Sequence, residues 1–69
     1  MIRPNITEQL EALIDGSSLL DVLTGLSLIC SEKADHIRDN WQDTTTARTW
    51  RKASNEIEVT VRRIDRLGI

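Results

Sequence analysis

Apolar and polar residues alternate along most of the chain with the three- and four-residue steps of amphipathic α-helices. The longest such segment runs from Ser18 to Trp41. Ser18 precedes its first apolar residue and Asp21 follows three positions later, a pattern typical of a helix N-terminus. The apolar stripe of this segment consists of Leu19, Val22, Leu23, Leu26, Ile29, Cys30, Ala34, Ile37 and Trp41. The pattern predicts one long helix over residues 19–41.

The other side of this predicted helix is mostly polar. It carries Thr24, Ser27, Ser31, Glu32, Asp35 and Asp39. Leu20 and Leu28 fall outside the main stripe and widen the apolar surface beyond what one neighbouring helix could cover. We therefore expect this helix to have more than one helical neighbour.

Two further helices are predicted, one on each side. Asn5 followed by Glu8 is a second N-terminal cap signal, and the apolar spacing after it predicts a short helix over residues 6–14. Asp15-Gly16-Ser17 predicts a turn in which Gly16 takes the left-handed conformation. After the threonine run, with Asp43 or Thr44 as N-cap, near-heptad spacing predicts a third helix over residues 45–67. Its apolar or small positions are Ala47, Trp50, Ala53, Ser54, Ile57, Val61, Ile64 and Leu67.

The two long helices are similar in length and joined by a short connection, so they must run antiparallel. A turn centred on Asp43–Thr44 predicts that apolar positions face each other along the hairpin. The expected pairs are Ile37 with Trp50, Ala34 with Ser54, Cys30 with Ile57, Leu26 with Val61 and Leu23 with Ile64. The predicted fold class is all-α: one small domain over residues 1–69, built as an antiparallel helical hairpin with a short N-terminal helix.

Length and composition favour assembly. A 69-residue chain buries only about 60% of its unfolded surface, so a solitary monomer would be marginally stable. A single cysteine excludes an internal disulfide, and no Cys/His cluster has the spacing of a zinc site. Oligomerisation is the favoured source of the stability that a solitary monomer would lack. We predict a homodimer that forms a four-helix-type bundle.

Charge is uneven along the chain, although the net charge is only −2. Residues 1–43 hold three basic and eight acidic side chains, whereas residues 44–69 hold six basic and three acidic ones. The second and third helices should therefore attract each other, and the same asymmetry favours antiparallel association of two hairpins. No run approaches the roughly 20 apolar residues of a membrane span. The lone cysteine and the lack of a signal-like segment predict a reducing, cytoplasmic setting.

Glu32 and His36 lie four residues apart and could bind a metal from one helix. Carboxylate sites in bundles, however, use Glu-x-x-His together with carboxylates from facing helices. The available Glu56 and Glu58 should lie near Cys30 instead of His36. A solvated polar face is therefore favoured over a metal site, and no cofactor is predicted.

Nothing in the sequence indicates catalysis. Cys30 and His36 are six residues apart and point to different faces, so they cannot form a nucleophile–base pair. There is no glycine-rich phosphate loop, and a hairpin has little room for a cleft. We predict that the protein is not an enzyme.

Trp41 and Trp50 flank the turn, and tryptophan is enriched at binding hot spots. They could instead form an apolar plug that closes this end of the bundle. The candidate partner-binding set at the tip is Glu32, His36, Asn40, Trp41, Asp43, Arg48 and Trp50.

The third segment is basic and could contact nucleic acid. Its basic residues are Arg48, Arg51, Lys52, Arg62, Arg63 and Arg66. A solvated basic face that complements the helix dipole is the favoured interpretation, because the whole chain is acidic and no short recognition helix is apparent.

The stretch ICSEKADHIRDNWQD (Ile29–Asp43), followed by Ala47, Trp50 and Ala53, resembles small uncharacterised helical proteins of bacteria and phages. These proteins share an EKxxHIxxNWQD-like segment followed by A-x-x-W-x-x-A, and the resemblance covers roughly Leu19 to Ile57. It implies that Glu32, His36, Asn40, Trp41 and Asp43 belong to one unit near the turn, but it implies no activity.

The sequence thus predicts a non-enzymatic protein-interaction or regulatory module of the phage or mobile-element accessory type. It would pair with itself and bind an unidentified protein partner through the hairpin tip. The alternatives are a small nucleic-acid-associated regulator that uses the third helix, and a metal-binding bundle that uses Glu32 and His36.

Overall fold

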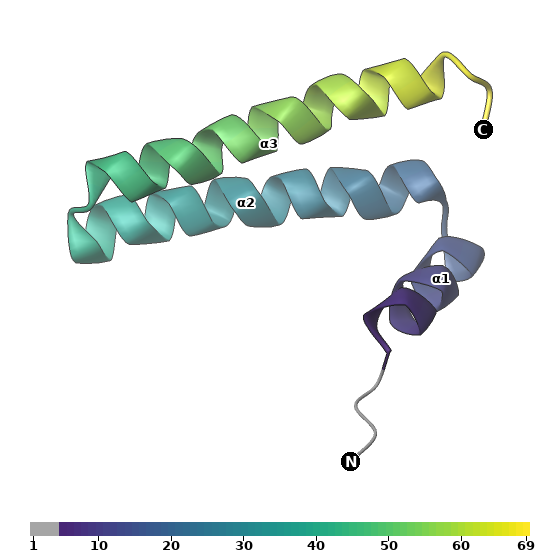
Figure 1. Ribbon diagram of the computed structural model, residues 1–69, viewed down its shortest axis with the longest axis horizontal. Coiled ribbons are helices and arrows are strands. Elements are labelled where there is room, and N and C mark those ends of the chain that lie inside the picture. The colour runs from purple at the N-terminus through teal and green to yellow at the C-terminus, as the bar shows by residue number, and fades with distance from the viewer. Residues whose placement is uncertain (1–4) are drawn as a thin grey trace.

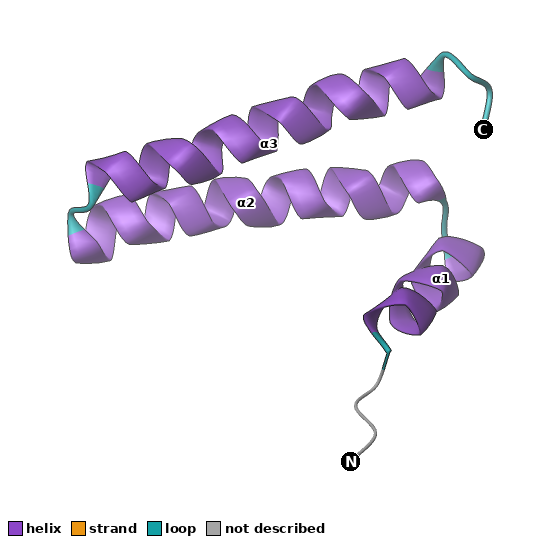
Figure 2. Ribbon diagram, in the orientation of Figure 1, coloured by secondary structure: helices purple, strands orange, loops and turns teal. Residues whose placement is uncertain are grey.

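The computed structural model describes residues 5–69, which form three α-helices and no strand (Figures 1 and 2). They are α1 (Ile6–Gly16), α2 (Leu19–Trp41) and α3 (Thr44–Asp65). α2 and α3 lie side by side and antiparallel, whereas α1 leaves the open end of this hairpin with a bend of 118° between α1 and α2. The all-helical hairpin with a short N-terminal helix is confirmed.

Each helix begins at a side-chain cap. The side-chain oxygen of Asn5 accepts from the N–H of Thr7 at 2.8 Å, and the hydroxyl of Ser18 accepts from Asp21 at 3.0 Å. Asp43 Oδ1 accepts from the N–H of Thr46 at 3.0 Å. Each cap satisfies a first-turn N–H that has no partner within its helix, so the short polar side chains fix where the helices start.

α1 continues through Gly16 in helical conformation, so the predicted left-handed turn at this glycine is wrong. The chain changes direction at Ser17, whose φ is −141°, and at the extended Ser18. The Ser17 N–H donates to the carbonyl of Ile14 at 3.2 Å, and its hydroxyl donates to Asp21 at 2.8 Å. These bonds hold the corner between α1 and α2, so the conformational freedom of a glycine is not needed there.

The turn between α2 and α3 contains only Gln42 and Asp43, and Gln42 has a left-handed φ of 51°. We expect Gln42→Gly to raise the free energy of unfolding by about 0.5–1 kcal/mol. Relief of the left-handed strain, roughly 1–2 kcal/mol, exceeds the entropic cost of a freer unfolded chain, roughly 0.4–1 kcal/mol. Urea titration followed by circular dichroism measures the change, and a lower stability for the variant would contradict it.

Small residues form the seam between α2 and α3. The buried residues among positions 5–69 are Ser27 and Ala34 of α2 and Ala47 and Ser54 of α3. Both pairs are seven residues apart, so they line one side of each helix. The Ser54 hydroxyl donates to the Ser27 carbonyl at 2.9 Å, and the two hydroxyls lie 3.0 Å apart. Small side chains let the two backbones approach closely, and the serine pair satisfies the polar groups buried there.

This seam corrects the predicted register. Ser54 bonds Ser27 instead of facing Ala34, and Ala34 lines a cavity together with Ala47. Ser27, expected on the solvated side of its helix, is 4% exposed. The helices meet along the small edge of the apolar stripe and not along its centre. Four large apolar side chains of α2 consequently remain exposed: Leu26, Leu28, Ile29 and Trp41.

The described chain is a flat layer. It measures 40 × 38 × 14 Å, so its thickness is close to that of one helix. Figure 1 views the layer down this shortest axis. Its radius of gyration is 14.4 Å, against about 11 Å for a compact domain of this length. It exposes 5696 Å², whereas a compact monomer of 7.8 kDa exposes about 4,400 Å². A single layer has no interior, so both faces of the hairpin are open.

Among residues 5–69, no single helix is long and apolar enough to cross a membrane. α1 and α2 taken together reach the required length and composition, but with the bend of 118° between them.

Candidate functional site

The main candidate surface is one face of the hairpin, which we call the apolar face. α2 contributes Val22, Leu26, Ile29, Lys33 and Ile37 to it, and α3 contributes Trp50, Ala53, Ile57 and Ile64. Trp50 lines a groove with α2. Ala53, Ile57 and Ile64 follow Trp50 at helical spacing, so they lie on the same side of α3. The apolar face is therefore two helices wide and about as long as the hairpin.

Two grooves share Ile29: one lies between α2 and α3 on the apolar face, and the other lies between α1 and α2. The groove nearer the tip, about 390 Å³, is lined by Ile29, Glu32, Lys33, His36, Ile37 and Trp50. The groove nearer α1, about 300 Å³, is lined by Leu10, Leu13, Ser17, Asp21, Val22, Gly25, Leu26 and Ile29. The α2 residues that line the two grooves extend from Val22 to Ile37, about 22 Å at the rise of an α-helix. Apolar grooves of this kind suit a helix with an apolar side.

Large apolar side chains on and beside this face lack cover. Leu26 is 39% exposed, Ile29 48% and Leu13 58%. α1 itself contains no buried residue. Monomeric proteins rarely leave so continuous an apolar surface open unless another chain binds it.

Lys33 and Trp50 mark the tip end of the apolar face. The Lys33 ammonium lies 5.6 Å from the centre of the Trp50 ring, within the range of a cation–π contact. His36 lies one turn farther along α2 and Asn40 two turns. The Asn40 side-chain amide donates to the His36 carbonyl at 3.0 Å and lies 3.1 Å from His36 Nδ1. These contacts order the polar rim of the groove next to the tryptophan.

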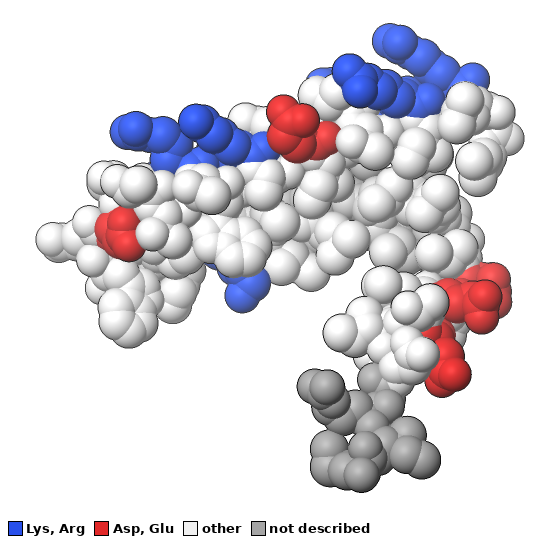
Figure 3. Space-filling view, in the orientation of Figure 1, with Lys and Arg blue, Asp and Glu red and all other residues white. Residues whose placement is uncertain are grey.

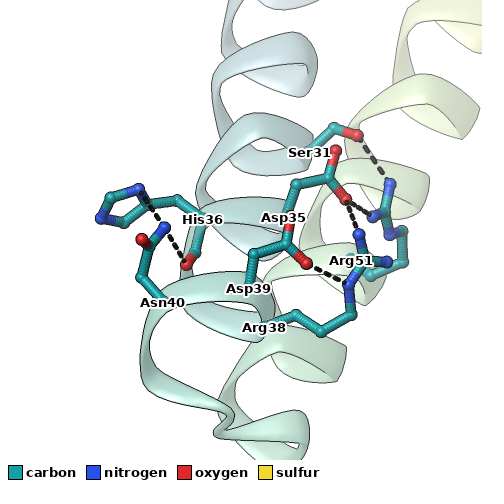
Figure 4. Close-up of polar contacts among 7 residues, drawn as sticks. All are labelled: Ser31, Asp35, His36, Arg38, Asp39, Asn40 and Arg51. Atoms are coloured by element: carbon teal, nitrogen blue, oxygen red, sulfur yellow. Dashed lines mark hydrogen bonds and ion pairs between the residues drawn. The ribbon is translucent and has the colours of Figure 1, made fainter.

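The opposite face is polar and links the two helices. Arg51 of α3 donates to the Ser31 hydroxyl at 2.7 Å and to Asp35 at 2.5 Å (Figure 4). Arg38 bonds Asp39 at 3.0 Å and lies 3.5 Å from Asp35. The hydrogen bond to Asp39, with the charges of both aspartates, raises the pKa of the Arg38 guanidinium. Figure 4 shows His36 and Asn40 on the other side of α2 from this cluster.

The structure brings together only some of the predicted tip residues. Glu32, His36 and Trp50 line one groove, and Asn40 bonds His36. Arg48 lines a different cavity, with Ala34, Arg38, Thr44, Ala47 and Arg51.

The other two predicted tip residues do not line the groove. Trp41 is 73% exposed, so it does not plug the end of this single chain. Asp43 serves as the cap of α3.

Sequence reasoning did not include Lys33, Ile29 and Ile37 in the candidate site. The available signal was position: Lys33 lies four residues from each isoleucine and interrupts the apolar stripe with a charge. A lysine in that position can lay its aliphatic stem along an apolar surface.

A third metal ligand does not join Glu32 and His36. Within the described 65 residues, no three His, Cys, Asp or Glu side chains are placed to hold one ion. Glu58 instead accepts a long hydrogen bond, 3.4 Å, from the Ser27 hydroxyl.

The Asp43 cap makes the start of α3 sensitive to acid. Hydrogen bonds donated by the Thr46 backbone and hydroxyl lower the pKa of the Asp43 carboxyl below its usual value. A lowered folded-state pKa stabilises the fold above the unfolded pKa, and this contribution is lost as pH falls through the folded value. We expect Asp43→Asn, which keeps a capping oxygen, to show a smaller loss of stability between neutral and acidic pH than the parent. Urea titrations at the two pH values test this, and equal losses would contradict it.

Charge is segregated on the surface. Figure 3 shows Lys and Arg side chains in two groups along the outer edge of α3 with acidic side chains between them, further acidic side chains at α1 and near the tip, and one basic group on the lower side of the hairpin. Elsewhere, the hairpin in this view is largely uncharged.

The chain matches no protein-family model, and comparisons with curated proteins and with solved structures give no significant match.

Proposed function

We propose that this protein is a non-enzymatic protein-interaction module that acts as a homodimer. Two hairpins would stack through their apolar faces into a four-helix-type bundle. The tip would remain free for a second protein, in keeping with a regulatory or accessory role of the phage or mobile-element type. The proposal places the protein in a reducing, cytoplasmic setting, because Cys30 is unpaired.

The uncovered apolar face carries this proposal. The chain exposes about 1,300 Å² more than a compact monomer of its mass would. A standard interface removes about 800 Å² from each partner, so the excess is large enough to supply one. A second copy offers the same face, and two-helix layers that stack apolar side inward form a four-helix bundle.

The grounds for a dimer differ from those that the sequence suggested. The sequence predicted that Leu28 needs a partner outside the hairpin, because it falls outside the main apolar stripe. In the structure, Leu28 lies on the polar face and lines a groove with Ser31 and Glu58. Leu26 and Ile29 carry the argument instead. Sedimentation equilibrium of the unmodified chain tests the assembly: a dimer at micromolar concentration is expected, and a stable folded monomer would refute it.

At the tip, Trp41 is the side chain best placed to anchor a second protein. It is 73% exposed, and exposed tryptophans that become buried on binding commonly contribute 2 kcal/mol or more, about a 30-fold change in affinity.

We expect Trp41→Ala to remain folded and dimeric but to lose partners that the parent captures from native cells. Leu67→Ala is the matched control, because Leu67 is 71% exposed at the other end of the hairpin. Equal capture by both variants would exclude the tip as the binding site.

A second function, association with nucleic acid, is favoured by one observation only, the basic outer edge of α3 (Figure 3). Phosphate contacts would make binding to duplex DNA strongly salt-dependent. Gel retardation at low salt that disappears in Arg48→Gln/Lys52→Gln would support this function, and no retardation at low salt would exclude it.

A further inference from the structure

We infer that the cavity between α2 and α3 near the hairpin tip is a binding site for a phosphate group. The cavity lies on the polar face, away from the apolar face that would pair two hairpins, so the inference does not depend on the proposed dimer. Its volume is about 240 Å³. Three arginines, one threonine and two alanines line it: Arg38, Arg48, Arg51, Thr44, Ala34 and Ala47.

The three arginines reach the cavity from both helices. Arg38 of α2 and Arg51 of α3 approach the same oxygen, Asp35 Oδ1, at 3.5 and 2.5 Å. Their guanidinium groups therefore lie close together (Figure 4). Arg48 precedes Arg51 by about one turn of α3 and lines the same cavity. Three positively charged groups thus surround one small volume.

Nearby carboxylates neutralise this charge only in part. Asp35 and Asp39 pair with Arg38 and Arg51, so three guanidinium charges against two carboxylates leave a balance of +1. Arg48 is exposed and makes no hydrogen bond or ion pair with any side chain of residues 5–69. Arg48 and Arg51 are also like charges three residues apart on one helix, which is unfavourable unless an anion lies beside them.

The other carboxylate at the turn, Asp43, does not line the cavity. Its two oxygens accept from the backbone N–H and the hydroxyl of Thr46. Thr44 is the first residue of α3, so the cavity also lies beside a helix N-terminus, which favours anions.

The paired arginines retain free hydrogen-bond donors. A guanidinium group has five N–H bonds. Arg38 uses Nε for Asp39 and Nη2 for Asp35, and Arg51 uses one N–H on each terminal nitrogen for Ser31 and Asp35. Two of five are used in each case, so three remain on each residue. An anion in the cavity can therefore accept from all three arginines while the ion pairs of the chain persist.

This arrangement favours a phosphate group over a carboxylate. A carboxylate has two oxygens in one plane, and a single arginine can satisfy both with parallel hydrogen bonds. A phosphate monoester carries close to two negative charges and has three acceptor oxygens that point in different directions. Donors from three arginines on two helices match such a group in number and in charge.

The phosphate group can belong to the free ion or to a monoester, such as a phosphorylated side chain of a protein at the tip. A nucleic-acid backbone fits a single cavity less well, because it presents a row of phosphates that a row of basic side chains would follow. Binding to DNA is therefore treated as an alternative outcome of the test.

Carbon-detected nuclear magnetic resonance of the isotope-labelled chain tests the inference. We would titrate inorganic phosphate, and separately phenyl phosphate, at pH 8 and constant ionic strength. Phosphate monoesters are dianionic at this pH. We expect saturable shifts of the Ala47 methyl group and of the side-chain carbons of Arg38, Arg48 and Arg51. Tighter binding of phenyl phosphate would assign the site to monoesters, and tighter binding of inorganic phosphate would assign it to the free ion.

Arg48→Gln removes the cavity arginine that has no partner within the described chain, so circular dichroism should show an unchanged fold. We expect the half-saturating phosphate concentration to rise at least about 10-fold, because charge-assisted hydrogen bonds are lost. Arg63→Gln is the matched control. It removes the same charge at an exposed position about 22 Å farther along α3, beyond the Debye length of about 8 Å. It should change the concentration by less than about 2-fold.

Shifts that increase linearly without saturation would overturn the inference, and so would an equal response of the two variants. A response of Arg48 and Lys52 to duplex DNA with none to either phosphate would also overturn it and would favour the nucleic-acid function. The proposed dimer is tested separately by sedimentation, because Arg48 does not belong to the apolar face.

Discussion

Ile29→Glu should convert the dimer into monomers. Ile29 is 48% exposed in the single chain and lines both grooves, so it belongs to the open apolar surface of α2 that the proposed interface would cover. A carboxylate there would be buried without a partner, which is strongly unfavourable. A two-fold axis brings the substitution into the interface twice. We expect the dimer to weaken by at least about 100-fold, equivalent to roughly 2.7 kcal/mol.

Leu28→Glu is the matched control for this prediction. Leu28 is adjacent in sequence and 62% exposed, but it lies on the polar face. The Leu28→Glu variant should therefore remain dimeric in the same sedimentation experiment. Equal dissociation of both variants, or persistence of both dimers, would show that the apolar face is not the interface.

Ala34→Leu should open the hairpin. Ala34 is 2% exposed in the seam between α2 and α3, and Ala47 of the same seam is 7% exposed. Three added carbon atoms cannot fit where two backbones approach over small side chains, and overpacking of this kind typically costs about 1–3 kcal/mol. A single core of this size rarely supplies more than about 3–5 kcal/mol, so the loss is a large share of the total.

The measurement for the seam is the free energy of unfolding in urea, with helical circular dichroism as the signal. Ala12→Leu serves as the control, because Ala12 is exposed on α1 and the chemical change is identical. We expect the control to change stability by no more than about 0.5 kcal/mol. A seam variant as stable as the control would mean that the close contact between α2 and α3 does not stabilise the fold.

Local signals in the sequence determined the helices and their order. Asn5, Ser18 and Asp43 each cap a helix through one short-range hydrogen bond, and such bonds depend only on neighbouring residues. The short turn then requires the two long helices to run antiparallel. Gly16 was the exception. It is helical, and Ser17 and Ser18 make the turn that the sequence predicted at this glycine.

The candidate site could be predicted only in part, because spacing shows which residues of one helix lie together but not how α3 packs against α2. Glu32, His36 and Asn40 follow one another at four-residue steps on α2, so helical spacing alone places them together. Trp50 joins Glu32 and His36 only through the packing of α3, and Lys33 over its ring was not anticipated. Arg48 lines a cavity on the other face because of the rotation of α3 about its own axis, which spacing within one helix does not reveal.

The apolar spacing of α2 and α3 by itself determined that each helix has an apolar side. Only the tertiary structure decided which side of each helix faces the other. That choice depends on how closely two particular surfaces approach and on polar groups that match across the gap, as Ser27 and Ser54 do. Because small residues form the seam, Leu26, Ile29 and Trp50 lie on an open face. This open face is the basis for the proposed assembly.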